Sequence, residues 1–151
     1  MRDWNSLYNN LSDGEKDKIA ILRVMECANG CIQYAFRDET PYALSIEDTR
    51  RAMKFSMSCM KNMSIPLKEG TITFAPETEK LCREVRDLYI KGFKQGDEEA
   101  YEEFMNSSAA CVNAIGKERI VKAQEVLAKN VDDIPPHTLE WGVHYMMQFL
   151  E

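Results

Sequence analysis

Three side chains near the end of the sequence have the types and the spacing of metal ligands. His137, Glu140 and His144 follow one another at intervals of three and four residues, which places them on one side of a helix. Imidazole and carboxylate groups bind zinc and iron. However, all three come from one helix, and the chain has no other histidine to complete the set. We therefore expect no metal cofactor, and a metal-dependent enzyme using this set is the last of the alternative functions.

The cysteines indicate structural thiols. Cys27 and Cys31 lie four residues apart on a predicted helix, which is not the CxxC turn that lowers a thiol pKa or binds zinc. An odd total inside helical patterns also argues against a disulfide framework. A Cys–His nucleophilic site would need the fold to bring a histidine against a cysteine. We expect all five to be reduced and buried: Cys27, Cys31, Cys59, Cys82 and Cys111.

Methionines recur along the segment after Ser45. Met53, Met57 and Met60 fall on one helical stripe, and such a stripe usually faces the core, where the flexible thioether fills irregular space. The alternative is an adaptable apolar pocket formed by these three methionines and Cys27. That pocket would make the protein a small-ligand-binding or regulatory module.

A run of acidic residues follows Gly96. No basic residue occurs between Lys94 and Lys117, and the first two predicted helical turns carry Asp97, Glu98, Glu99, Glu102 and Glu103. Acids near a helix N-terminus interact favourably with the helix dipole, and solvent-facing turns are often charged. Like charges four residues apart repel each other, however, so helix stability alone does not explain the run. A solvated helix face and a docking surface for a basic partner both stay open.

The charge of the chain is unevenly distributed. Residues 1–74 contain ten acidic and ten basic residues, whereas residues 75–151 contain fifteen acidic and nine basic ones, so the second half carries the whole net charge of −6. Because such a surface repels phosphate, we do not expect direct nucleic-acid binding. The leading hypothesis is a non-catalytic acidic helical protein that docks on a basic protein partner through Glu98, Glu99, Glu102 and Glu103. One form of such a protein is an immunity or antitoxin-type inhibitor that covers a cationic active site.

Residues that start and stop helices indicate which predicted helices carry the candidate side chains. Ser12 with Glu15 matches a capping box, Pro76 suits a first helical turn, and Gly96 followed by Asp97 separates two helices. The alternation at residues 71–74 indicates a short strand, which residues 42–44 would pair with. Helices are expected at 12–40, 45–63, 76–95, 97–115, 117–130 and 137–150.

The predicted helix at 12–40 is apolar nearly all round from Ile19 to Phe36, which is typical of a helix at the centre of a domain. One polar strip interrupts it. We expect this strip to face solvent. The alternative is that it lines a polar pocket. It comprises Arg23, Glu26, Asn29, Gln33 and Arg37.

The sequence thus predicts a single all-α domain over residues 1–151, a bundle of five or six helices with at most one short β-hairpin. No apolar run approaches the length of a membrane span, and no signal peptide is evident, so we expect a cytoplasmic protein without membrane partners. Nucleotide-binding glycine loops, nucleophile elbows, and zinc-protease and di-iron helix motifs do not occur in the chain.

Overall fold

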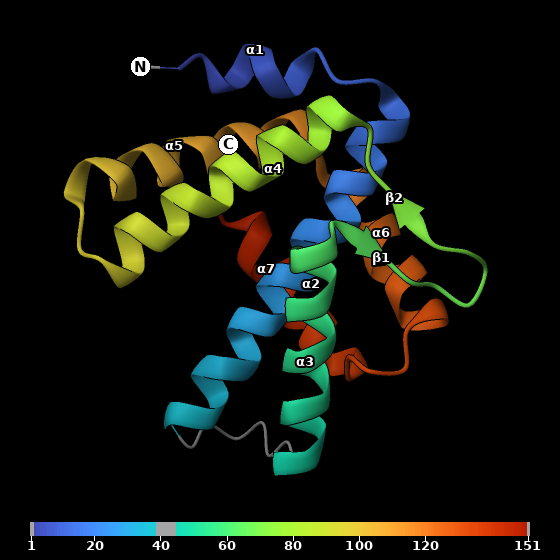
Figure 1. The fold of residues 1–151 in the computed structure, drawn as a ribbon. Coiled ribbons are helices and arrows are strands. Elements are labelled where there is room, and N and C mark those ends of the chain that lie inside the picture. Colours follow the sequence, from blue (N-terminus) through green and yellow to red (C-terminus); the bar gives the residue numbers. More distant parts are fainter. Residues whose placement is uncertain (1, 39–44, 151) are drawn as a thin grey trace.

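The computed structural model describes residues 2–38 and 45–150, except for the side chains of residues 31–38. Within this part, seven α-helices, one π-helical turn and one two-stranded sheet follow one another along the chain. The predicted all-α fold with one short hairpin is confirmed (Figure 1). The elements are α1 (Trp4–Asn9), α2 (Asp13–Asp38), α3 (Ile46–Asn62), β1 (Ser64–Ile65), β2 (Ile72–Thr73), α4 (Pro76–Tyr89), η1 (Ile90–Lys94), α5 (Glu98–Ile115), α6 (Lys117–Asn130) and α7 (Pro136–Met147).

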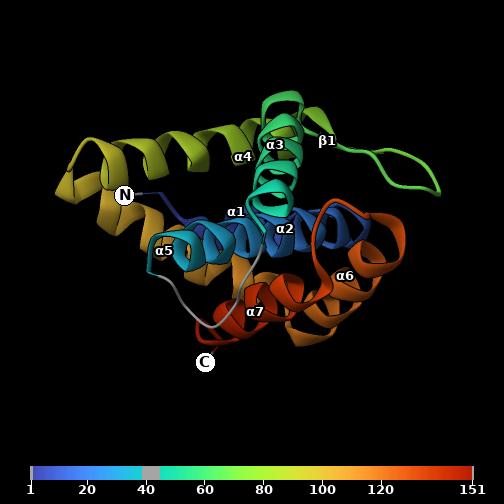
Figure 2. The ribbon, with the colours of Figure 1, turned by 90° about the horizontal axis from the view of Figure 1, so that it is seen from below.

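Helix α2 is the axis of the fold. Seen from below, it lies between α3 and α4 on one side and α6 and α7 on the other (Figure 2). Its most extensive contact is with α7, followed by that with α6. The sequence prediction of a central, largely apolar helix is confirmed, because the following side chains of α2 are fully or almost fully buried: Ile19, Ala20, Leu22, Val24, Met25 and Ala28.

A glycine allows α7 to lie close to α2. A Cβ atom at Gly142 would come within 2.9 Å of the backbone nitrogen of Ala28 and of the carbonyl oxygen of Val24. Because these are backbone atoms, they cannot rotate away as a side chain would. Leu139 and Met146 flank this point on α7 and are fully buried. The contact therefore brings the two backbones together between layers of apolar side chains.

The sequence did not predict α1. Its first turn is capped by Asp3, whose carboxylate accepts hydrogen bonds from the amide and the hydroxyl of Ser6 at 3.2 and 2.8 Å. Trp4 and Tyr8, four residues apart, are both buried, and α1 packs on α5. Asp3 and Ser6 are a recognisable cap, so the start signal was present in the sequence.

The predicted strand pairs with a segment other than the one expected. Ile72 and Thr73 form β2, which is antiparallel to β1 with Ile65 opposite Ile72. The proposed partner, residues 42–44, lies outside the described residues. Ile65 is fully buried, so the hairpin contributes one side chain to the hydrophobic core.

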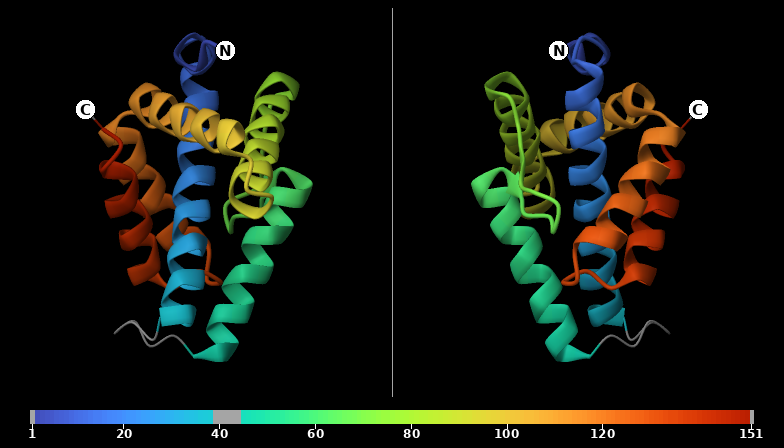
Figure 3. Two further views of the ribbon diagram at one scale, coloured as in Figure 1. Left: turned by 90° about the vertical axis from the view of Figure 1, so that its left-hand side faces the viewer. Right: turned by 90° about the vertical axis from the view of Figure 1, so that its right-hand side faces the viewer.

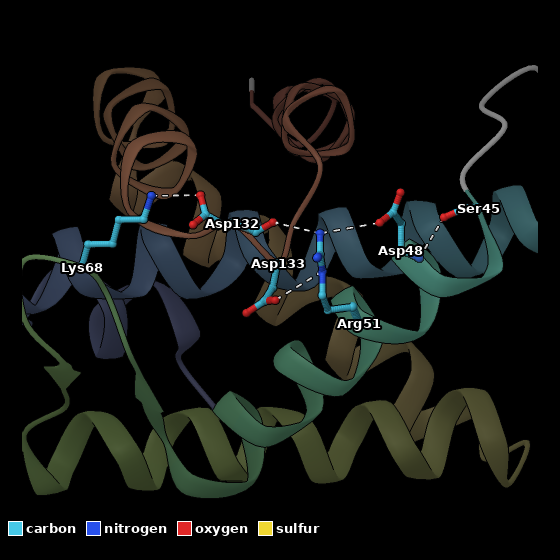
Figure 4. A network of polar contacts seen from close by, with 6 residues as sticks. All are labelled: Ser45, Asp48, Arg51, Lys68, Asp132 and Asp133. Atoms are coloured by element: carbon cyan, nitrogen blue, oxygen red, sulfur yellow. Dashed lines mark hydrogen bonds and ion pairs between the residues drawn. The ribbon is translucent and has the colours of Figure 1, made fainter.

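Helix α3 is inclined to α2, as Figure 3 shows with α2 upright, and its buried side chains are small. A surface network fixes it to the loop between α6 and α7 (Figure 4). Arg51 pairs with Asp133 at 3.4 Å and with Asp48 at 3.6 Å, and it donates to the carbonyl of Asp132 at 3.4 Å. Lys68, from the hairpin loop, binds the Asp132 carboxylate at 2.9 Å. These contacts join three separate segments at one edge of the molecule.

Candidate functional site

The hairpin formed by α4 and α5 ends in a tight turn, and this end projects beyond the other helices (Figure 1). At Tyr89 the α-helix widens into the π-helical turn η1, and Gly96 then reverses the chain with φ +72°. Asp97 caps α5, since its carboxylate accepts the amide hydrogen of Ala100 at 3.1 Å. The predicted glycine stop and aspartate cap are both confirmed.

Gly92 holds the two arms of the hairpin in close contact. A Cβ atom there would lie 2.7 Å from both the Cα and the backbone nitrogen of Tyr101. Only glycine lets η1 approach α5 this closely. Single π-helical turns frequently occur at functional sites, and this one sets the register between the aromatic residues on either side of the turn.

Four aromatic side chains stack around this contact. Phe93 is at the centre, with its ring centroid 4.8 Å from that of Tyr89, 5.0 Å from that of Tyr101 and 5.5 Å from that of Phe104. Tyr89, Phe93 and Tyr101 nevertheless remain 40%, 49% and 44% exposed. We call these four residues the aromatic tip. A cluster of large apolar rings that is half open to solvent is a typical feature of interaction surfaces.

The predicted docking residues border the aromatic tip. Glu98, Glu99 and Glu102 are exposed and Glu103 is half-buried. Helical spacing places Glu98 and Glu102 on the stripe next to Tyr101, with Glu99 and Glu103 further round. We call the four glutamates the acidic rim. Tyr101 faces outward, whereas Ala100 and Ser107 lie on the buried side of α5.

The acidic rim has no ion-pair partner among the described residues. Some carboxylates elsewhere form ion pairs, as Glu79 does with Arg83, whereas others, such as Glu118 and Glu125 on α6, have none within the described chain either. No rim glutamate forms an ion pair or a side-chain hydrogen bond with any of the described residues. The rim therefore presents an uncompensated negative field beside the exposed rings.

The described part of the polar strip of α2 is buried or half-buried, so the expectation that it faces solvent was wrong there. The Arg23 side chain is only 14% exposed, and its Nη1 donates to the Glu26 carboxylate at 2.8 Å. Asn29 is 6% exposed. Arg23 is covered by side chains from α1, α4 and α5. The side chains of Gln33 and Arg37 lie outside the described part of the chain.

Several weakly acidic groups surround Arg23. The thiols of Cys82 and Cys111 and the phenol of Tyr8 interact with it electrostatically, and the Tyr8 hydroxyl lies 3.1 Å from that of Ser107. Burial alone would lower the pKa of Arg23, but Glu26, Cys111, Tyr8 and Cys82 together outweigh it and hold that pKa above its ordinary value. Arg23 therefore stays charged and links α2 to the helices that cover it.

Burial makes the thiols of this region poor nucleophiles. It raises the pKa of Cys82 and of Cys59 to about 11 and also raises that of Cys111. Protonated thiols neither attack carbon centres nor bind metals well. Cys27 is a half-buried thiol, and the side chain of Cys31 lies outside the description.

The methionine stripe does not form the core face of α3. Met57 is 59% exposed, and Met53 and Met60 are half-buried. The buried face of α3 is instead made of smaller residues: Thr49, Ala52, Ser56 and Cys59. The three methionines and Cys27 are therefore exposed or half-buried rather than fully buried.

The candidate metal ligands of α7 point outward. His137, Glu140 and His144 are all exposed, and His144 lies edge-on to Trp141 with ring centroids 5.8 Å apart. Among the described side chains, those of residues 2–30 and 45–150, no group of three His, Cys, Asp or Glu is arranged to hold a metal ion. Likewise, no helix of the described chain has the length and apolar character needed to cross a membrane.

Sequence reasoning missed the aromatic half of this surface. Tyr89 and Phe93 lie four residues apart before the turn, and Tyr101 and Phe104 lie three apart after it. This arrangement was visible in the sequence, but it resembles an ordinary core pattern unless the π-helical turn is known. Comparison of the chain with protein-family models, with curated proteins and with solved structures gave no match.

Proposed function

We propose that this protein is a non-catalytic binding protein that docks a basic protein partner on the acidic rim and the aromatic tip. The observation that carries the proposal is the combination of two features on one hairpin: half-exposed stacked rings, and glutamates without an internal counter-charge. Aromatic residues are enriched at protein interfaces and dominate their energetics. Complementary charge accelerates association and selects partners.

One class of protein that would act in this way is an inhibitor of an enzyme that binds nucleic acid. An inhibitor of a nucleic-acid enzyme must cover a cationic groove that is shaped for phosphate, and four glutamates on a projecting hairpin suit that task. The proposed compartment is the cytoplasm, because Cys59, Cys82 and Cys111 are thiols rather than disulfides.

Charge reversal tests the proposal. Native host extract is passed over immobilised wild-type protein, over the variants Glu98→Lys/Glu102→Lys and Glu99→Lys/Glu103→Lys, and over the control Glu118→Lys/Glu125→Lys. The control changes the net charge equally but on α6, where both glutamates are exposed. Bound proteins are identified by mass spectrometry at low and high salt.

We expect a basic protein that binds the wild type and the α6 control and is lost from both rim variants. With the purified partner, the rim variants should associate more slowly, and their association should depend less on salt. A partner that binds all four proteins equally well would refute docking at the rim.

A further inference from the structure

We propose that the partner presents arginine to this surface, with a guanidinium stacked on Tyr101 and bonded to Glu98 and Glu102. The inference rests on the proposed function and specifies its partner chemistry. A lysine-rich segment would satisfy the charge of the rim equally well, so the choice between the two depends on the aromatic tip.

The rings are partly open to a planar cation. Tyr101 and Phe93 lie 5.0 Å apart with an interplanar angle of 52°, and about half of each side chain is open to solvent. Arginine stacks on aromatic faces through both cation–π attraction and its flat, weakly hydrated guanidinium. A lysine ammonium is a compact, strongly hydrated point charge and gains less from such a face.

The carboxylates are placed to complete the contact. Glu98 precedes Tyr101 by three residues, a spacing at which side chains on a helix are neighbours, and Glu102 lies four residues after Glu98 and is therefore its neighbour in turn. Residues four apart on a helix have their Cβ atoms roughly 6 Å apart. One guanidinium, with five N–H donors in a fixed fork, can reach two such carboxylates, whereas an ammonium has no planar fork to match them.

No internal cation competes for this position. Lys91 and Lys94 are the basic residues of the turn, and neither forms an ion pair with another residue of the described chain. The surface is also held in place before binding, because Gly92 packs the turn directly on the backbone of Tyr101. Such pre-organisation reduces the entropy lost when a ligand is immobilised.

Two fluorescent peptides of equal length and charge, one of alternating glycine and arginine and one of alternating glycine and lysine, test the inference by anisotropy titration at fixed salt. The wild type should bind the arginine peptide roughly fivefold more tightly than the lysine peptide. Tyr101→Leu should reduce this preference to about twofold or less, while Tyr101→Phe, which keeps the ring face, should retain it. Glu98→Gln/Glu102→Gln should weaken binding of both peptides, unlike Glu118→Gln/Glu125→Gln.

The outcomes distinguish failure of the arginine preference from failure of the proposed function. Equal affinity for the two peptides, lost on changing Glu98 and Glu102, would overturn the arginine preference and leave docking of basic partners intact. An arginine preference that survives Tyr101→Leu would also overturn it. If neither peptide shows binding that depends on these glutamates, both the inference and the proposed function fail.

Discussion

The carboxylate of Glu15 accepts a hydrogen bond from the backbone amide of Ala75, 60 residues further along the chain, at 2.6 Å. Ala75 is the N-cap residue of α4 and has no side chain that can cap the helix. Glu15 lies in the first turn of α2, so one helix supplies the cap of another. The sequence predicted a capping box in which Glu15 returns to Ser12. Only half of that box forms, with the Glu15 amide donating to the Ser12 hydroxyl at 3.2 Å.

Loss of this cap should reduce stability in a pH-dependent way. Burial raises the pKa of Glu15, but hydrogen bonds from Lys18 and the Ala75 amide outweigh it and lower that pKa from its ordinary value of 4.5. A lowered native pKa means that Glu15 stabilises the fold above about pH 4.5 and that this contribution is lost as the pH falls through the native pKa. Glu15→Gln should therefore lower the free energy of unfolding by about 1 kcal/mol at pH 7, and the difference should shrink below pH 4.

Denaturant unfolding of the wild type and Glu15→Gln at a series of pH values measures this effect. Glu77→Gln, at an exposed position in the first turn of α4, is the matched control and should show a smaller change. A wild-type advantage that does not change with pH would contradict the assigned role.

The Arg23–Glu26 pair should behave as one unit. Glu26→Ala leaves a buried guanidinium without its counter-charge and should cost about 2 kcal/mol or more. Arg23→Met removes the charge but keeps the apolar stem, so it should cost less. The double variant should be more stable than the sum of the single effects predicts, which a double-mutant cycle by denaturant unfolding measures. Additive effects would show that the pair is not coupled.

Two glycines of the helices should respond in opposite ways to alanine. Gly142→Ala places a Cβ atom against the backbone of α2 and should destabilise the fold by about 1–3 kcal/mol, because α7 must move outward. Gly30→Ala meets nothing within 4 Å in the middle of α2 and should stabilise the fold by about 0.5–1 kcal/mol. Thermal unfolding distinguishes the two, and equal shifts for both variants would contradict the close approach of the helices.

Arg51 should hold α3 in place without contributing much to global stability. Its ion pairs are exposed, so Arg51→Ala should change the free energy of unfolding by less than about 1 kcal/mol. Amide hydrogens of α3 should nevertheless exchange faster, because the contact with the loop at Asp132 and Asp133 is lost. The neighbouring variant Arg50→Ala removes an exposed charge and should leave the exchange of α3 unchanged. Equal exchange in the two variants would rule out this role.

Local signals predicted the helices well. Ser45 caps α3 by accepting the Asp48 amide at 3.0 Å, and Asp97 caps α5, as their residue types indicated. Such caps act over a few residues and are therefore visible in the sequence. The pairing of β2 with Ser64–Ile65, by contrast, depends on how α3 ends, which no short motif encodes.

The site was harder to predict than the fold. The glutamates of the acidic rim were singled out from charge alone, whereas Arg23 was expected at the surface and the aromatic tip was not recognised. Both errors arise because a helical wheel assigns faces without knowing which helix covers which. Side chains from α1, α4 and α5 surround Arg23, and Phe93 lies in the π-helical turn between the two arms of the hairpin. These are tertiary effects that override local pattern.

The central position of α2 also affects how the chain reaches its native state. The largest contact of α2 is with α7, which is synthesised about a hundred residues later. The apolar face of α2 therefore stays uncovered until α7 has been made. Contacts between such distant segments slow folding, because a long loop must close before they form. While the chain is being synthesised, Val24 and Ala28 are uncovered, and that period is when the chain is most exposed to aggregation.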